Sequence, residues 1–125
     1  MFIALKEALL KYKKLKVLGL CFGHQALAKM YGGKVDKYNL YAGIEKIQFR
    51  KEKLLSYPYF SNILKFDHDL FISEYHGDSV SKIPNSFISI AGSDSCIHES
   101  MISEDGRCLS FQFHAEYTNS YTRGY

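Results

Sequence analysis

The sequence lacks an apolar run that could cross a membrane. Its apolar stretches are short and repeatedly interrupted by charged residues, whereas a membrane-spanning helix needs roughly 18 consecutive apolar residues or more. The N-terminus also lacks the charged and then apolar pattern of a secretion signal. We therefore expect a soluble, cytoplasmic protein with no membrane partner.

The sequence also has little that suggests disulfides or a metal site. Its three cysteines, Cys21, Cys96 and Cys108, include no C-x-x-C pair, and an odd number favours reduced thiols. No spacing typical of metal ligands links His24, His68, His76 and His98. A His-x-Glu sequence near the C-terminus resembles half of the zinc deaminase signature, but the P-C-x-x-C half is absent. We expect no metal.

Composition and charge indicate one globular domain. The 125 residues are 46% hydrophobic and 23% charged, which is typical of a single domain with one core, and we assign that domain to residues 1–125. The formal net charge is +3, and part of it comes from four lysines between residues 11 and 16. No zinc-finger spacing accompanies this cluster, so we interpret it as a solvated face and expect no nucleic-acid partner.

The first third of the chain has the pattern of an α/β fold. Residues 2–13 carry apolar side chains at helical spacing and predict an amphipathic helix. Residues 16–20, KVLGL, predict a strand buried on both faces of a parallel sheet. Residues 23–33 predict a helix that Gly32 and Gly33 close, because glycine tolerates the left-handed conformation at a helix end.

The rest of the chain predicts mainly strands. Residues 35–49 indicate short strands around a loop at 39–43, residues 51–66 indicate an irregular or partly helical connection, and residues 76–84 indicate a turn. Further strands are expected at 69–76 and 87–93, and two more flank the hairpin signal Asp105-Gly106. His114 then falls where the final strand ends.

Residues 19–23 read Gly-Leu-Cys-Phe-Gly, the thiol counterpart of the G-x-S-x-G nucleophile elbow, between a predicted strand and a predicted helix. The glycines allow a sharp turn that presents Cys21, and the helix N-terminus is expected to lower the pKa of the thiol. The backbone N–H of Phe22 is expected to point into an oxyanion hole. A cysteine at a strand end can also be only a small buried residue, but the two glycines favour the nucleophile.

His114, Ala115 and Glu116 follow the last predicted strand. A thiol nucleophile needs a base, and the base needs a carboxylate that fixes its tautomer, so a histidine and a glutamate two residues apart fit these two roles. The alternative is a surface histidine beside a solvated glutamate. Together with the elbow, the pair favours a Cys-His-Glu triad.

Three segments together resemble the class I (triad) glutamine amidotransferases in order and spacing: LGLCFGHQALAKMYGG, YHGDSVSKIPNSFISIAGSD and SFQFHAEYT. The likeness is greatest to the glutaminase domains of GMP synthase type and their stand-alone eukaryotic relatives. It implies an α/β fold, namely a partial flavodoxin-like three-layer sandwich with a mostly parallel central sheet and a C-terminal hairpin.

The resemblance also implies the chemistry. Cys21 would attack the side-chain amide of glutamine, His114 would act as base and then acid, and Glu116 would orient it, giving glutamate and ammonia without a cofactor. Four residues match family positions that contact or line the glutamine pocket: Gln25, His76, Gly77 and Asp78. A synthetase domain or subunit that accepts the ammonia is the implied partner.

The sequence departs from the family pattern in three ways. Ala115 stands where the family usually has proline, which we expect to loosen the backbone between the two triad residues. The chain begins at the helix before the nucleophile strand, so we expect it to lack the N-terminal strands and the loop that supplies a second oxyanion donor. It also stops soon after Glu116, before the closing helix expected there. The alternatives are therefore an inactive fragment or pseudoenzyme that serves as an interaction module, or a related γ-glutamyl hydrolase.

Overall fold

The structure is a computed structural model, and it describes residues 2–65 and 69–116. Its elements follow one another as α1 (Phe2–Lys11), β1 (Val17–Leu20), α2 (Phe22–Met30), β2 (Lys34–Phe49), α3 (Lys51–Leu54), η1 (Pro58–Phe60), α4 (Ser61–Leu64), β3 (Leu70–Lys82), β4 (Phe87–Gly92), β5 (Ser100–Ser103) and β6 (Cys108–Phe111). The first helix, the helix after Cys21 and the C-terminal hairpin are confirmed. The strand before Cys21 is present, but the prediction that it is buried on both faces is wrong, because β1 lies at the edge of the sheet and Leu18 is 60% exposed. None of the helices in these two ranges combines the length and the apolar character that crossing a membrane requires.

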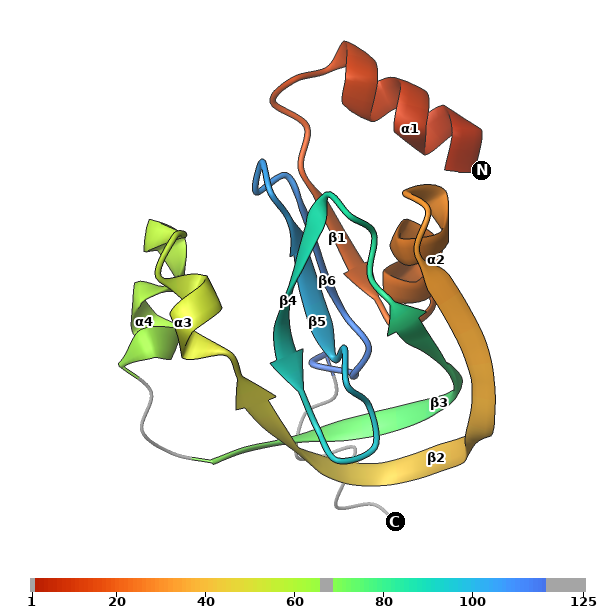
Figure 1. The fold of residues 1–125 in the computed structure, drawn as a ribbon, viewed down its shortest axis with the longest axis vertical. Helices are drawn as coiled ribbons and strands as arrows, with labels where there is room; N and C mark the ends of the chain where they lie inside the picture. Colours follow the sequence, from red (N-terminus) through yellow and green to blue (C-terminus); the bar gives the residue numbers. More distant parts are fainter. Residues whose placement is uncertain (1, 66–68, 117–125) are drawn as a thin grey trace.

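The strands form one six-stranded sheet in the order β1-β6-β5-β4-β2-β3 (Figure 1). Only β1 and β6 pair in parallel, while every other neighbouring pair is antiparallel. The prediction of a mostly parallel sheet is therefore wrong. Its physical reason is that β4, β5 and β6 follow one another through short connections, which reverse the chain and produce antiparallel neighbours.

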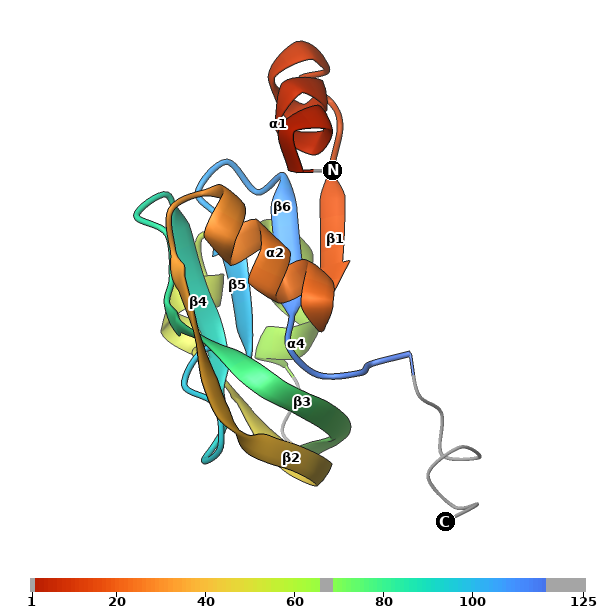
Figure 2. The same ribbon diagram turned by 90° about the vertical axis from the view of Figure 1, so that its right-hand side faces the viewer.

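Helices cover both faces of the sheet, which confirms the three-layer arrangement. Helix α2 lies in front of the sheet and α4 behind it in Figure 2, while α3 and α4 lie together on one side in Figure 1. Successive residues of a strand point to opposite faces. Accordingly, Met101 of β5 packs in the cluster that contains Leu27 and Ala28 of α2, while Ile102 packs in the cluster that contains Leu54 of α3.

Strands β2 and β3 form a long antiparallel ribbon, and two sequence-based expectations fail there. The chain from 39 to 43 is part of β2 and not a loop, because the pairing is only interrupted by an irregularity between Lys37 and Tyr41. Gly77 lies within β3 and makes no turn there, since Lys37 pairs with Asp78 and Tyr41 with His76. Cross-strand hydrogen bonding along the ribbon outweighs the local turn propensity of these residues.

Glycines shape both ends of α2. At its C-terminal end Gly32 has φ +90°, and the N–H of Gly33 donates to the carbonyl of Ala28 at 2.7 Å, a helix ending that favours glycine. At the N-terminal end, a Cβ on Gly19 would lie 2.7 Å from the backbone of Gly23. Strand β1 therefore approaches α2 so closely that residue 19 has no room for a side chain.

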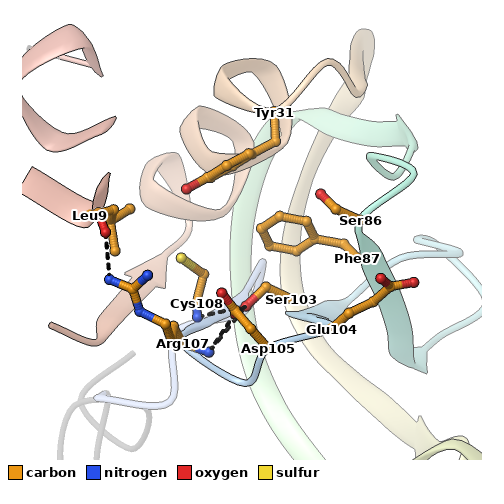
Figure 3. A pocket seen from close by; sticks show the side chains of 9 residues that line it. All are labelled: Leu9, Tyr31, Ser86, Phe87, Ser103, Glu104, Asp105, Arg107 and Cys108. Atoms are coloured by element: carbon orange, nitrogen blue, oxygen red, sulfur yellow. Dashed lines mark hydrogen bonds between the residues drawn. The ribbon is translucent and has the colours of Figure 1, made fainter. Parts of the chain in front are cut away.

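Arg107 ties α1 to the turn between β5 and β6 (Figure 3). Its Nη2 donates to the carbonyls of Leu9 and Tyr12, both at 2.7 Å, and its Nε donates to the carbonyl of Leu15 at 3.1 Å. Carbonyl groups at a helix C-terminus lack partners within the helix and carry partial negative charge, so a guanidinium satisfies them well. This contact fixes the start of β6 and the first helix as one unit.

Candidate active site

Cys21 sits at the junction of β1 and α2 in a strained backbone conformation. Its φ is +48° and its ψ is −100°, and among the described residues it is the only residue other than glycine with positive φ. Its carbonyl accepts hydrogen bonds from the N–H groups of His24 at 3.1 Å and Gln25 at 3.3 Å, so the first turn of α2 starts directly from the strained residue. Such strain is typical of functional turns, and it is the geometry that the elbow motif predicts.

Three parts of the chain meet at the Cys21 thiol. Its backbone N–H donates to the carbonyl of Phe111 at 2.8 Å, which joins it to the end of β6. Its Sγ lies 3.7 Å from the carbonyl oxygen of Tyr75 on β3. The side-chain amide of Gln112 donates to the same sulfur at 3.6 Å. The sulfur is therefore held between β3 and the segment after β6.

The pKa of the Cys21 thiol is raised above its ordinary value. Burial is the largest cause, the hydrogen bond from the backbone N–H of Phe22 offsets part of it, and the negative charges of Glu116 and Glu74 raise the pKa further. The expectation of a lowered pKa is therefore wrong for the protein as it stands, because desolvation of the thiolate outweighs the helix N-terminus. The thiol needs a base that takes its proton.

His114 and Glu116 lie together just after β6. The Nδ1 of His114 donates to Oε1 of Glu116 at 2.6 Å, and the side chains are 15% and 44% exposed. The N–H of His114 donates to the carbonyl of Ser73 at 2.9 Å, which attaches this segment to β3, two residues from Tyr75. The charge of Glu116 acts on the Cys21 thiol, so the two triad candidates and the thiol lie at the same edge of the sheet.

Hydrogen bonds keep the Glu116 carboxyl ionised. Burial would raise the pKa of this carboxyl, but the hydrogen bond from His114, a bond from its own backbone N–H and the charge of His114 together lower it below the ordinary value. An ionised carboxylate beside Nδ1 fixes the imidazole tautomer whose lone pair is on Nε2. The last two residues of the terminal motif, Tyr117 and Thr118, lie outside the described residues.

Gln25 connects the elbow with the His-Gly-Asp segment. Its side-chain amide donates to the carbonyl of Asp78 at 2.9 Å and to Oε1 of Gln112 at 3.2 Å. Asp78 thus contacts Gln25 through its backbone and not its carboxylate. His76 is only 7% exposed and turns toward Glu74, while space around Gly77 is open, with nothing within 4 Å of a Cβ built there.

His24 lies within the motif but has a structural role. It is fully buried, its Nε2 donates to the carbonyl of His98 at 2.9 Å, and its Nδ1 accepts from the hydroxyl of Ser110 at 2.8 Å. Burial lowers its pKa to about 4, so the ring is neutral near pH 7. It fastens α2 to β6 and to the chain before β5.

Sequence reasoning missed the second layer around the thiol. Gln112 and Tyr75 fall inside the segments that carry the family resemblance, but neither was given a role, although both contact the sulfur of Cys21. The buried Glu74 acts on the thiol and the buried Glu99 accepts from the backbone of Gln112, and both lie outside these segments. A glutamine two residues before His114 was the only local signal. The rest depends on how β3 packs against β6, which no short sequence pattern reports.

The pocket beside Arg107 lies away from the candidate site residues. A pocket of about 250 Å³ between α2 and the β5–β6 turn is lined by Tyr31, Arg107 and their neighbours and contains none of the predicted site residues (Figure 3). Within residues 2–65 and 69–116, no group of three or more His, Cys, Asp and Glu side chains is arranged to hold a metal ion. His68 lies outside the described residues.

Comparison with known proteins agrees with this geometry. The family model of class-I glutamine amidotransferases matches residues 2–124. The chain belongs to this family. It is 40% identical over 108 residues to the glutamine-hydrolysing GMP synthase of Borrelia garinii subsp. bavariensis, and 34% identical over 106 residues to that of Tolumonas auensis. These alignments cover 86% and 83% of the chain but only 19% and 20% of the two relatives, so the chain spans about a fifth of their length.

Solved structures show the same fold. A glutamine amidotransferase from Thermotoga maritima superposes with a TM-score of 0.77 at 23% identity, over 98% of this chain and 49% of that one. A glutamine amidotransferase from Methylobacillus flagellatus gives 0.76 at 24% identity, over 98% and 46%. The described sheet and helices are therefore those of a class I glutamine amidotransferase domain, with a mixed sheet.

Proposed function

We propose that this chain hydrolyses the side-chain amide of glutamine through a Cys21 thioester, as part of a protein of GMP synthase type. The observation that carries the proposal is the meeting of a strained cysteine elbow with a hydrogen-bonded His114–Glu116 pair at one sheet edge. The family and the glutamine-hydrolysing names of the relatives support the substrate.

In the first half of the reaction, Nε2 of His114 takes the proton of the Cys21 thiol and the sulfur attacks the amide carbon. Collapse of the tetrahedral intermediate breaks the carbon–nitrogen bond, and the same proton passes from His114 to the leaving ammonia. The raised pKa of the thiol means that little thiolate exists beforehand, so proton transfer accompanies attack. Glu116 stabilises the imidazolium that forms between the two transfers.

In the second half, water hydrolyses the thioester. His114 takes a proton from the water, its oxygen bonds to the acyl carbon, and the carbon–sulfur bond breaks. The proton then returns to Cys21 and glutamate leaves. In both halves the negative oxygen of the tetrahedral intermediate accepts a hydrogen bond from the backbone N–H of Phe22. In the free protein this N–H hydrogen-bonds the Cys21 thiol.

The glutamine itself would lie between α2 and β3. Gln25, at the start of α2, is held by the carbonyl of Asp78 and by Gln112, and a fixed amide of this kind orients a substrate at low entropic cost. The open space around Gly77 leaves the backbone of His76, Gly77 and Asp78 able to receive the amino and carboxylate ends of the substrate. The ammonia acceptor would be a synthetase domain or subunit, as the names of the relatives indicate.

Ammonia and glutamate release by the purified protein tests the proposal. The expected result is equimolar glutamate and ammonia from glutamine, lost in Cys21→Ser and retained in Cys108→Ser, the matched change of a buried thiol outside the site. A γ-glutamyl peptide offered alongside glutamine tests the substrate. Faster hydrolysis of the peptide than of glutamine would replace the glutaminase assignment with γ-glutamyl hydrolase, and undiminished release by Cys21→Ser would refute both.

A further inference from the structure

Two glutamates are buried behind the candidate site. Glu74 of β3 is 3% exposed, and Glu99, just before β5, is fully buried. Burying a carboxylate away from water costs several kcal/mol unless its charge is paired, and two carboxylates side by side also repel each other. Their burial therefore needs a physical account.

Each glutamate has one oxygen with a partner and one without. Oε2 of Glu74 lies 2.7 Å from Nε2 of His76, and Oε1 of Glu99 accepts from the hydroxyl of Ser93 at 2.5 Å. Within the part of the chain that the structure describes, no donor reaches Oε1 of Glu74 or Oε2 of Glu99. The Glu74 carboxyl nevertheless acts on the Glu99 carboxyl both as a hydrogen-bonding group and as a charge, so the two carboxyl groups lie close together. Two ionised carboxylates have no donor between them, so one must carry a proton.

We propose that Glu74 and Glu99 share a single proton and that Glu99 is a positioning residue for Cys21. The shared proton gives both orphaned oxygens a partner, and it leaves one negative charge that the imidazolium of His76 neutralises. The pair then resembles other paired carboxyls that ionise one at a time because a second charge nearby is too costly.

The surroundings favour the proton on Glu99. Burial, then the Glu74 carboxyl, raise the pKa of Glu99 to about 9, although the Ser93 hydroxyl opposes the shift. Burial would lower the pKa of His76, but its hydrogen bond to Glu74 and the charge of Glu74 raise it overall. Two further charged groups act on these three residues: Glu45 of β2 acts on Glu99, and Asp78 acts on His76. The three buried residues act in turn on four titratable neighbours, namely Cys21, His24, Tyr41 and Cys96.

A continuous set of hydrogen bonds leads from this pair to the thiol. Nδ1 of His76 donates to the carbonyl of Asp78 at 2.9 Å, and the same carbonyl accepts from Gln25 at 2.9 Å. Gln25 also donates to Gln112, which donates to the sulfur of Cys21.

A second and shorter route joins the same two ends. The backbone N–H of Gln112 donates directly to the carbonyl of Glu99 at 2.7 Å. Gln112 is thus fixed through both its backbone and its side chain. Its backbone bonds directly to Glu99, and its side chain is connected through Gln25 and Asp78 to His76, the partner of Glu74. Loss of the shared proton at high pH would set two charges against each other and disturb both routes to Cys21.

Infrared difference spectra of the purified protein test the shared proton without any need for activity. At pH 7 we expect the carbonyl stretch of a protonated carboxyl, absent in Glu99→Gln and unchanged in Glu104→Gln, an exposed glutamate that serves as the matched control. The glutamine amide donates to Glu74 and accepts from Ser93, so Glu99→Gln keeps the fold. Absence of the band from the wild type at pH 7, or its persistence in Glu99→Gln, would overturn the shared proton.

The pH dependence of Cys21 alkylation by iodoacetamide, mapped to its peptide, tests the positioning role. At pH 7 Glu99→Gln should react like the wild type and Glu99→Leu severalfold more slowly, because leucine cannot donate to Glu74. Above about pH 9, where Glu99 ionises, the wild type should fall severalfold behind Glu99→Gln. If Glu99→Leu does not fold, the comparison of wild type with Glu99→Gln decides alone, and identical pH profiles of these two overturn the role.

The catalytic meaning of this role rests on the proposed glutaminase function, yet the two fail separately. A wild-type protein that releases no ammonia but shows the infrared band and the alkylation difference would refute the glutaminase and keep the positioning of Cys21. Ammonia release that depends on Cys21, with no infrared band and no alkylation difference, would support the glutaminase and refute the positioning role of Glu99.

Discussion

The two ends of β6 differ in how their polar groups are satisfied. At its start, Ser103 and Asp105 accept hydrogen bonds from backbone N–H groups of the turn, and Arg107 donates to carbonyls in the last part of α1 and just after it. At its end, Cys21 is strained, its thiol is desolvated, and the nearby glutamates leave two oxygens without a donor. Both ends are polar, but only the Cys21 end combines a strained backbone with buried carboxyl oxygens that no described donor reaches. Such features concentrate at functional sites.

The largest effect expected at the Cys21 end of β6 follows removal of the proposed base, His114. His114→Ala should lower ammonia release by about 10³–10⁴-fold, the upper end of the roughly 10²–10⁴-fold that a positioned acid or base contributes. Glu116→Ala should cost less, because this side chain is 44% exposed and water replaces part of its hydrogen bond. The measurement is the rate at saturating glutamine. Equal rates in wild type and His114→Ala would show that His114 is not the base.

The pH dependence of stability tests whether His24 is a buried, neutral histidine. Its folded pKa of about 4 lies below the ordinary value of 6.5, so between these values the unfolded chain binds more protons and stability falls as the pH falls. The loss amounts to roughly 3 kcal/mol between pH 6.5 and 4. Glu99, whose pKa is raised, makes stability rise as the pH falls and so opposes the effect of His24. The difference in the free energy of unfolding between wild type and His24→Gln isolates the contribution of His24. Denaturant unfolding should show that difference shrinking toward pH 4, and a constant difference would contradict the neutral, buried ring.

The two glycines of the elbow, Gly19 and Gly23, differ in the space around them. A Cβ at residue 19 would meet the backbone of Gly23 at 2.7 Å and Leu27 at 2.9 Å, whereas a Cβ at residue 23 meets nothing within 4 Å. Gly19→Ala should therefore destabilise by about 2–3 kcal/mol through overpacking. Gly23→Ala should leave the free energy of unfolding unchanged or slightly higher, since alanine favours a helix. Equal destabilisation by the two changes would mean that β1 and α2 are not packed this closely.

At the opposite end of β6, Arg107→Ala should lower stability by about 1–2 kcal/mol, because three backbone carbonyls lose a charged donor but remain partly accessible to water. The rate at which a thiol reagent modifies Cys21 should not change. Arg107→Lys, which keeps the charge but not the fork of donors, is the matched control and should lose less. A slower reaction of Cys21 in Arg107→Ala would show that the two ends are coupled.

The sequence was sufficient where a pattern is local. The strand before Cys21, the helix after it, the glycine ending of that helix and the Asp105-Gly106 hairpin each depend on neighbouring residues, and all four are present. The Cys21, His114 and Glu116 roles stay predictions, although their side chains lie at one sheet edge.

Features that depend on packing between distant segments were not predictable. Residues 39–43 and 76–78 have turn propensity, but pairing between β2 and β3 keeps both extended. The thiol pKa was expected to fall and instead rises, because burial of Cys21 depends on β3 and on Gln112. Glu74 and Glu99 stand 25 positions apart in the chain, so no motif indicates that their carboxyl groups meet.

The most direct test of the account is the position of a covalent label. A glutamine-analogue electrophile added to the wild-type protein should modify Cys21, because this cysteine stands at the strained turn after β1, while Cys96 is buried with its pKa raised to about 12 and Cys108 is buried at the far end of β6. Excess glutamine should protect it. Peptide mapping that finds the label on Cys96 or Cys108, with Cys21 unmodified, would contradict the assignment of Cys21 as the nucleophile.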